Sequence, residues 1–154
     1  MRQLAASGDR KVYDNILGAI GHTPLVRLAR VAHSVPARIY AKLENLNPGG
    51  SIKDRVGLYI IEQAERRGDL KPGGTVVEAT SGNTGVGLAI AAALKGYKTI
   101  FVMPDKMSNE KIMLLRAYGA KVVITPRTAP SRARHGPAAD ATGRARSGRL
   151  PRST

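Results

Sequence analysis

The sequence predicts an α/β protein built on a parallel βαβαβ sheet and followed by a disordered basic tail. Two observations lead to this prediction. Short apolar segments alternate with helical patterns between residues 75 and 125, which is typical of parallel strands joined by right-handed crossover helices. After Pro126 the composition changes abruptly, because nearly every position from 127 to 154 is Arg, Ala, Pro, Gly, Ser or Thr.

The chain divides into three regions by composition. We expect residues 1–11 to be a flexible N-terminus and residues 12–126 to fold. Two short apolar segments near the start of the folded region, Thr23 to Leu28 and Arg38 to Leu43, are predicted strands.

A helix is predicted to begin at Ser51 and to stop at Gly68. Ser51 is the expected N-cap, and Asp54 lies three positions later in a capping-box-like arrangement. One face of this helix is expected to be mostly apolar and comprises Ile52, Val56, Tyr59, Ile60 and Gln63.

The βαβαβ region follows directly. The predicted strands are residues 75–79, 98–103 and 121–125, and the predicted helical segments are residues 82–95 and 108–118. Gly96 and Gly119 follow the two helices at the position where a left-handed residue ends a helix.

The tail, residues 127–154, has one leucine and no valine, isoleucine, methionine or aromatic residue. It buries too little apolar surface to offset its chain entropy, so we expect it to be disordered. Two origins are open: a natural basic tail, or an out-of-frame reading of GC-rich DNA. Its seven arginines supply much of the net charge of +14.

Composition also excludes several classes of site. The 154 residues contain no cysteine, which excludes disulfides, thiolate catalysis and zinc-thiolate sites. No apolar run is long enough to span a membrane, and a cytoplasmic location fits. No metal site is predicted. The tail has no aromatic residue for base stacking, which disfavours nucleic acid as a partner.

The first segment with chemical character is NPGGSIKDR, residues 47–55. A glycine turn precedes a helix start, and Lys53 falls in the first turn of that helix. The helix dipole disfavours an ammonium ion there, and partial burial would disfavour it further. The neutral amine that results is a nucleophile suited to carbonyl compounds. A solvated first-turn lysine is the simpler alternative.

The second segment is EATSGNTG, residues 78–85. It lies at the carboxyl end of a strand and opens a helix, where backbone N–H groups and short hydroxyl side chains suit a carboxylate. A simple capping turn would need only one of these hydroxyls. The glycines of residues 85–90 fit a dinucleotide fingerprint poorly, because Ile90 stands at the third glycine position.

Taken together, these two segments resemble the cysteine synthase and cystathionine β-synthase family of fold-type II pyridoxal-phosphate enzymes. Residues 20–28 (IGHTPLVRL) and the segments around VMPDKMS, residues 102–108, and LRAYGA, residues 115–120, resemble the same family. The resemblance covers about residues 13–126 and implies part of the fold-type II architecture.

The resemblance also implies roles at matching positions. Lys53 matches the lysine that holds pyridoxal 5′-phosphate as a Schiff base and moves the α-proton. Asn83 matches the residue that hydrogen-bonds the cofactor's 3′ oxygen. The loop that grips the substrate carboxylate matches Thr80, Ser81, Gly82 and Thr84.

The implied reaction is β-replacement on serine or an O-acetylserine-type amino acid by a thiol nucleophile, in sulfur amino-acid biosynthesis. Family members are about twice as long, and the glycine- and threonine-rich loop that cradles the cofactor phosphate would lie beyond residue 126. No such stretch occurs here. We therefore expect a truncated enzyme with little or no activity alone, from a family whose members are homo-oligomers.

Two alternatives stay open. The first is a non-catalytic fragment that associates with an intact homologue or binds nucleic acid through its tail. The second is a serine or threonine dehydratase of the same fold. The residues of the two motifs favour the sulfur enzymes over the dehydratases.

Overall fold

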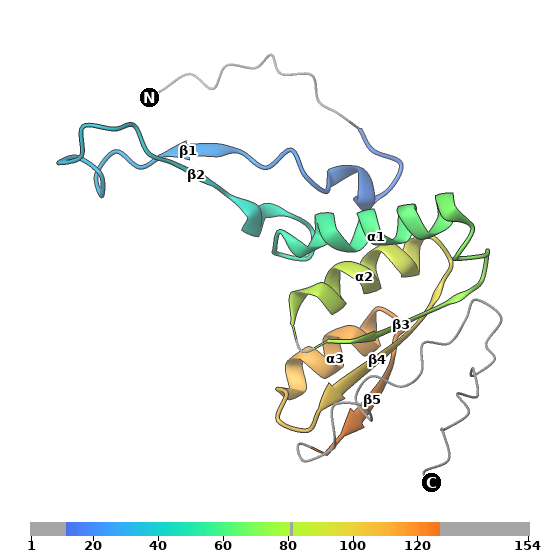
Figure 1. Ribbon diagram of the computed structural model, residues 1–154. Helices are drawn as coiled ribbons and strands as arrows, with labels where there is room; N and C mark the ends of the chain where they lie inside the picture. Colours follow the sequence, from blue (N-terminus) through green and yellow to red (C-terminus); the bar gives the residue numbers. More distant parts are fainter. Residues whose placement is uncertain (1–11, 81, 127–154) are drawn as a thin grey trace, which may run out of the picture.

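The computed structural model describes residues 12–80 and 82–126 of the chain. The flexible N-terminus and the disordered tail predicted above lie outside the described residues. Figure 1 shows three layers: a parallel sheet, the helices that cover one of its faces, and a further helix that packs on one of these two helices.

The sheet contains β3 (Thr75–Ala79), β4 (Lys98–Pro104) and β5 (Lys121–Thr125), in that order and all parallel. The predicted parallel βαβαβ sheet is therefore confirmed. β4 lies in the centre and alternates in burial, so that Phe101 and Met103 point into the core. The opposite face of the sheet is more open, and Val77 and Val123 are exposed there.

Two crossover helices connect these strands. α2 (Asn83–Leu94) joins β3 to β4, and α3 (Asn109–Ala117) joins β4 to β5. α2 is buried over most of its length and forms the centre of the hydrophobic core. Gly119 adopts a left-handed conformation after α3, as its sequence position predicts.

Helix α1 (Lys53–Arg67) packs lengthwise on α2. The contact depends on glycine: a β-carbon on Gly57 would overlap the backbone of Gly87, and one on Gly87 would overlap the carbonyl group of Lys53. At the far end of the helices, Glu65 accepts hydrogen bonds from Lys95 Nζ at 2.9 Å and from the Tyr97 hydroxyl at 2.7 Å. Gly87 thus serves helix packing.

The apolar face of α1 at Ile52, Val56, Tyr59 and Ile60 is exposed, because the Gly57 contact turns a different face toward α2. The prediction that Ser51 is the N-cap of α1 was wrong. The N-cap position belongs to Ile52, and no side chain caps the helix there. Ser51 Oγ instead accepts from the Lys53 N–H at 3.1 Å.

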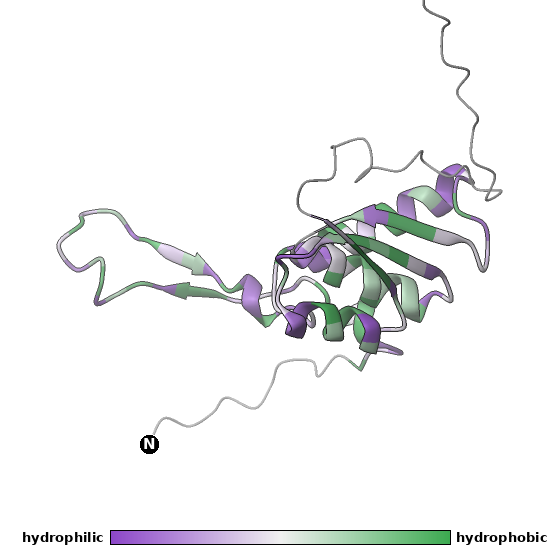
Figure 2. Cartoon of the chain, turned by 90° about the horizontal axis from the view of Figure 1, so that it is seen from below, coloured by the Kyte–Doolittle hydropathy of each residue, from purple (hydrophilic) through white to green (hydrophobic). Residues whose placement is uncertain are grey.

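The N-terminal part of the chain contributes a hairpin and two single turns of 3-10 helix. β1 (Leu25–Arg27) and β2 (Tyr40–Lys42) are antiparallel and shorter than the predicted strands. Figure 2 shows this hairpin extending away from the body of the protein. The 3-10 turns η1 (Ile16–Ala19) and η2 (Glu44–Leu46) lie before β1 and after β2. The hairpin buries few side chains, which explains why only three residues of each strand pair.

Candidate active site

The site lies where the N-terminal ends of α1 and α2 meet. Lys53 is the first residue of α1, and its carbonyl group lies against Gly87, one turn into α2. The loop of residues 80–82 precedes α2 directly. The two segments that the sequence singled out, residues 47–55 and 78–85, are separated along the chain by most of α1 but lie side by side in the structure.

Thr80 and Gly82 shape the loop after β3. The Thr80 N–H donates to the Val102 carbonyl at 3.2 Å, which extends the pairing of β3 with β4 by one residue. Thr80 is buried, and its hydroxyl oxygen accepts a long hydrogen bond from the Gly82 N–H at 3.4 Å. Gly82 then takes the N-cap position of α2 with no side-chain cap. The first N–H groups of α2 therefore receive no hydrogen bond from a capping side chain.

The other predicted site residues are distributed around this loop. Asn83 is exposed at the first position of α2, Thr84 is half-buried beside it, and Ser81 lies outside the described residues. Lys53 is exposed, so the partial burial that the sequence suggested is wrong. The reason is that the α1–α2 contact buries the Lys53 backbone and leaves its side chain outside.

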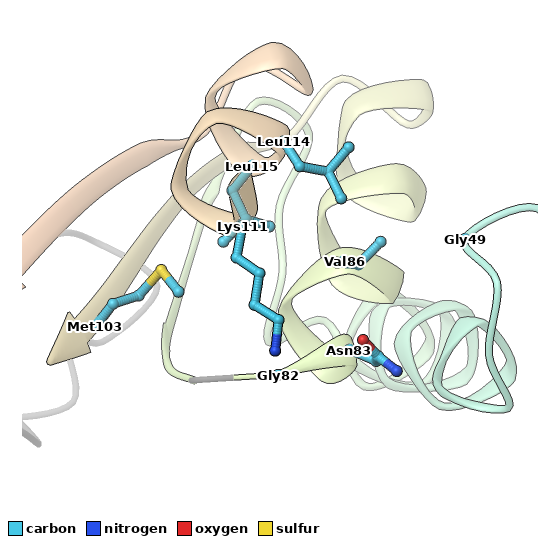
Figure 3. Close-up of a pocket in the computed structure, with 8 residues that line it drawn as sticks. All are labelled: Gly49, Gly82, Asn83, Val86, Met103, Lys111, Leu114 and Leu115. Atoms are coloured by element: carbon cyan, nitrogen blue, oxygen red, sulfur yellow. The ribbon is translucent and has the colours of Figure 1, made fainter. Parts of the chain in front are cut away.

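An open pocket of about 130 Å³ lies beside the loop. Figure 3 shows that it is bounded by the start of α2, by α3, by Met103 of β4 and by Gly49 of the glycine turn. Apolar side chains make up most of its wall. The lining residues are Gly49, Gly82, Asn83, Val86, Met103, Lys111, Leu114 and Leu115.

Asp54 fixes the glycine turn against α1. Its carboxylate accepts a short hydrogen bond from the Gly49 N–H, and a β-carbon on Gly49 would meet the same carboxylate. Asp54 is fully buried, and its Oδ1 has no partner among the described residues. Burial raises the pKa of the Asp54 carboxyl, and the Gly49 hydrogen bond opposes that rise. The capping box predicted from Asp54 is thus replaced by a contact that shapes the pocket wall.

A second polar cluster ties the N-terminal hairpin to α1, and sequence reasoning missed it. Glu44 accepts from Arg55 Nε at 2.9 Å, from Arg55 Nη2 at 3.0 Å and from the Thr23 hydroxyl at 2.7 Å. Asn47 donates to Glu44 Oε2 at 2.8 Å and accepts from the Gly21 N–H at 2.8 Å. The hydrogen bonds from Arg55 and then from Thr23 are the main causes that lower the pKa of Glu44 to about 2.

Acidification is therefore expected to release the hairpin from α1. A pKa of about 2 in the folded chain, against 4.5 ordinarily, means that Glu44 stabilises the fold fully above pH 4.5 and loses this effect as the pH falls toward 2. The protection factors of the Gly21 and Leu43 amides, obtained by NMR after division by the intrinsic exchange rate at each pH, should fall over that interval.

The E44Q variant is the control for this prediction, because glutamine does not titrate. Its protection factors at these two amides should already be low at pH 6 and should change little down to pH 2. Asp54 titrates with the opposite sign, since its raised pKa makes the fold less stable as pH rises through its range. Equal acid responses of the wild-type and E44Q chains would contradict the assignment to Glu44.

Two further findings limit the kinds of site present. Over residues 12–80 and 82–126, no three His, Asp or Glu side chains come together in a way that could hold a metal ion. Within the same ranges, no helix combines the length and the apolar character needed to cross a bilayer.

The residues present fit part of a pyridoxal-phosphate site. An accessible amine, Lys53, and a side-chain amide, Asn83, stand at neighbouring helix starts, and the pocket that Asn83 lines has the apolar wall that an aromatic ring requires. A loop that would enclose the phosphate is not found among the described residues.

Comparison with known proteins identifies the wider family. The family described as pyridoxal-phosphate dependent enzyme matches residues 16–149. Cysteine synthase from Staphylococcus aureus (strain Mu50) is 56% identical over 117 residues, which are 76% of this chain and 38% of that protein. Cystathionine β-synthase from Apis mellifera is 56% identical over 118 residues, 75% of this chain and 23% of that protein.

Solved structures agree with these matches. O-ureido-L-serine synthase superposes with a TM-score of 0.75 at 46% identity, over 81% of this chain and 39% of that one. A hydrogen sulfide-producing enzyme from Fusobacterium nucleatum gives a TM-score of 0.73 at 46% identity, over 77% and 39%. The chain thus spans less than two fifths of the length of these curated relatives. It belongs to the pyridoxal-phosphate dependent enzyme family, and its fold is part of the fold-type II architecture.

Proposed function

We propose that this chain carries the cofactor-linking and carboxylate-binding part of an enzyme that performs β-replacement on serine or an O-acetylserine-type amino acid, with a sulfur nucleophile. The observation that carries the proposal is the contact of Lys53 with α2 at Gly87, which sets the amine-bearing helix start beside the loop of residues 80–84. The printed names of the relatives, synthases of cysteine and of cystathionine among them, support this reaction class.

Each residue has a distinct task in this proposal. Lys53 holds the cofactor covalently and, once released, moves the proton at the α-carbon of the substrate. Asn83 donates its side-chain amide to an oxygen of the cofactor ring. Thr80, Ser81, Gly82 and Thr84 bind the substrate carboxylate through hydroxyl and backbone N–H groups. Pyridoxal phosphate, when bound, supplies the electron sink for breaking the bond at the β-carbon.

The assignment of Lys53 predicts selective labelling. Incubation of the chain with pyridoxal phosphate, reduction with borohydride and peptide mapping by mass spectrometry should place one cofactor per chain on Lys53. The K53Q variant should lose essentially all of this stoichiometric label. Lys71, an exposed lysine in the turn after α1, is the matched control, and K71Q should label like the wild type. Stoichiometric label on any other residue would reject the assignment.

A further inference from the structure

Asp54 follows Lys53 directly in α1, and the structure buries it completely. Over residues 12–80 and 82–126, every other Asp, Glu, Lys, Arg or His residue is at least partly exposed. Burying an ionisable group costs free energy unless a contact compensates for it. The reaction proposed above gives Asp54 no task, although it stands beside the residue that would carry the cofactor.

The carboxyl group of Asp54 holds the glycine turn that leads into α1. Its Oδ2 atom accepts the short hydrogen bond from the Gly49 N–H. Gly50 follows in the left-handed region at a φ of 78°, and its N–H donates to the Asn47 carbonyl at 2.8 Å. Gly49 in turn lines the pocket beside the start of α2, as Figure 3 shows. A side chain buried in α1 therefore fixes one wall of the pocket.

The main chain at Lys53 is fixed from another side by α2. A β-carbon on Gly87 would overlap the Lys53 carbonyl group and would come within 3.1 Å of the Asp54 α-carbon. The Lys53 N–H donates to Ser51 Oγ at 3.1 Å. The exposed side chain of Lys53 thus starts from a main chain that is held between the α1–α2 contact and the hydrogen bond of Asp54 to Gly49.

The surroundings of Asp54 leave its carboxyl group without a compensating cation. Oδ1 has no partner among the described residues, and none of the ion pairs found there includes Asp54. α2 carries no titratable side chain. The charged residues on the other elements around this turn and pocket are Lys53 and Arg55 of α1, Glu44 of η2 and Lys111 of α3. Burial raises the pKa of the Asp54 carboxyl, the Gly49 hydrogen bond opposes that rise, and the charge of Glu44 adds to it.

We propose that Asp54 is a positioning residue for Lys53, which keeps the glycine turn closed by accepting the Gly49 N–H and so holds the lysine beside the loop of residues 80–84. The acceptor oxygen performs this task, and a negative charge is not required. An uncharged carboxyl or a side-chain amide has the same acceptor. The inference rests on the proposed function, because the position of Lys53 matters to the reaction only if this residue links the cofactor.

The first test needs no cofactor and follows hydrogen exchange of the ¹⁵N-labelled full chain. The Phe101 amide in the central strand β4 is the internal reference. D54A should lower the protection factor of the Gly49 amide, relative to that of Phe101, by about tenfold, as the loss of one buried hydrogen bond implies. D54N should keep the ratio near that of the wild type. Ile61 is buried on the same helix, and I61A should weaken protection at Phe101 without lowering the ratio.

The pH profile separates the hydrogen bond from simple space filling. The closed turn binds the Asp54 proton more tightly than an open turn does, because burial raises the pKa of this carboxyl above 3.8. Protection of Gly49 in the wild type, divided by that in D54N at the same pH, should therefore fall as the pH rises through the raised range. The other titratable groups are common to both chains, so their effects cancel. If D54A does not fold, this profile decides.

Selective labelling connects the turn to Lys53. Limiting pyridoxal phosphate and borohydride give a ratio of label on Lys53 to label on Lys71, an exposed lysine of the same chain. D54A should lower this ratio toward equality, because an open turn no longer holds Lys53 beside the loop of residues 80–84. D54N and I61A should both retain the wild-type ratio.

Several results would overturn the role of Asp54. These are full Gly49 protection in D54A, a loss in D54N as large as in D54A, a wild-type to D54N ratio that does not change with pH, or a label ratio that I61A lowers as much as D54A does. The cofactor assignment fails separately. Wild-type label on a residue other than Lys53 rejects that assignment, whereas label on Lys53 with an equal ratio in D54A rejects the positioning role.

Discussion

Replacing Gly57 by valine is expected to abolish cooperative folding of this chain. A β-carbon at residue 57 would overlap the carbonyl carbon and oxygen of Gly87, which are backbone atoms that no rotamer change can move aside. The two helices would have to separate, and α1 would lose the surface that buries Ile61. Overpacking typically costs about 1–3 kcal/mol and more where the backbone must shift, which is a large part of the stability of a small domain.

Urea unfolding followed by circular dichroism checks this expectation. G57V and G87V should lose the cooperative transition, since each removes the same close approach from one side. Y59V is the matched control, because Tyr59 lies on the exposed side of α1 and valine has about the same helix propensity as tyrosine. A wild-type-like transition in G57V would show that the helices do not cross at this point.

The sheet was predictable because its strands carry strong local signals. β3 and β5 begin and end at the predicted residues, and β4 extends one residue further. Each strand is a short run of apolar residues bounded by glycine or by a helix start, and parallel strands are normally of this kind. The glycine that ends α1, Gly68, was found for a similar reason, since its left-handed conformation is a local property.

The packing of α1 could not be predicted in the same way. A pattern of apolar residues identifies the helix face that carries the most apolar side chains. On α1 this face contains Ile52, Val56 and Tyr59. The contact with α2 depends instead on Gly57, where the absence of a side chain lets two backbones meet. A glycine inside a helical pattern signals such a contact, but the sequence does not tell which second glycine completes it.

The site was predictable to the extent that its parts are local motifs. Lys53 and the loop of residues 80–84 stand out because each combines a glycine turn, a helix start and reactive or hydroxyl side chains. The cluster around Glu44 went unnoticed because its partners Thr23 and Arg55 are distant from it in the sequence. Lys111 belongs to a helix whose own pattern has no chemical signal, so only the folded pocket relates it to Gly82.

The largest expected effect on activity is the near absence of turnover by this chain. In the proposed function the described residues would hold the cofactor at two points, Lys53 and Asn83, and both side chains are exposed. Enzymes of this kind rely on a bound cofactor that is oriented and shielded from water. The loss of a single preorganised contact to developing charge typically costs about 10²–10³ in rate. Binding the cofactor phosphate and shielding the cofactor from water would each require contacts of this kind beyond those of Lys53 and Asn83, so the expected loss in rate exceeds that of one contact.

We therefore expect kcat/KM for formation of a thioether or of cysteine to be at least about a thousandfold below that of the Staphylococcus aureus cysteine synthase measured alongside. Mass spectrometry of products formed from O-acetylserine and sulfide, and from serine and a thiol, provides the readout. K53Q sets the background, because any product that persists in that variant comes from elsewhere. Rates within tenfold of the relative would contradict this prediction and show that Lys53, Asn83 and the loop of residues 80–84 suffice for catalysis. Slow turnover with full labelling of Lys53 would show that this chain attaches the cofactor but does not hold it in the orientation that catalysis needs.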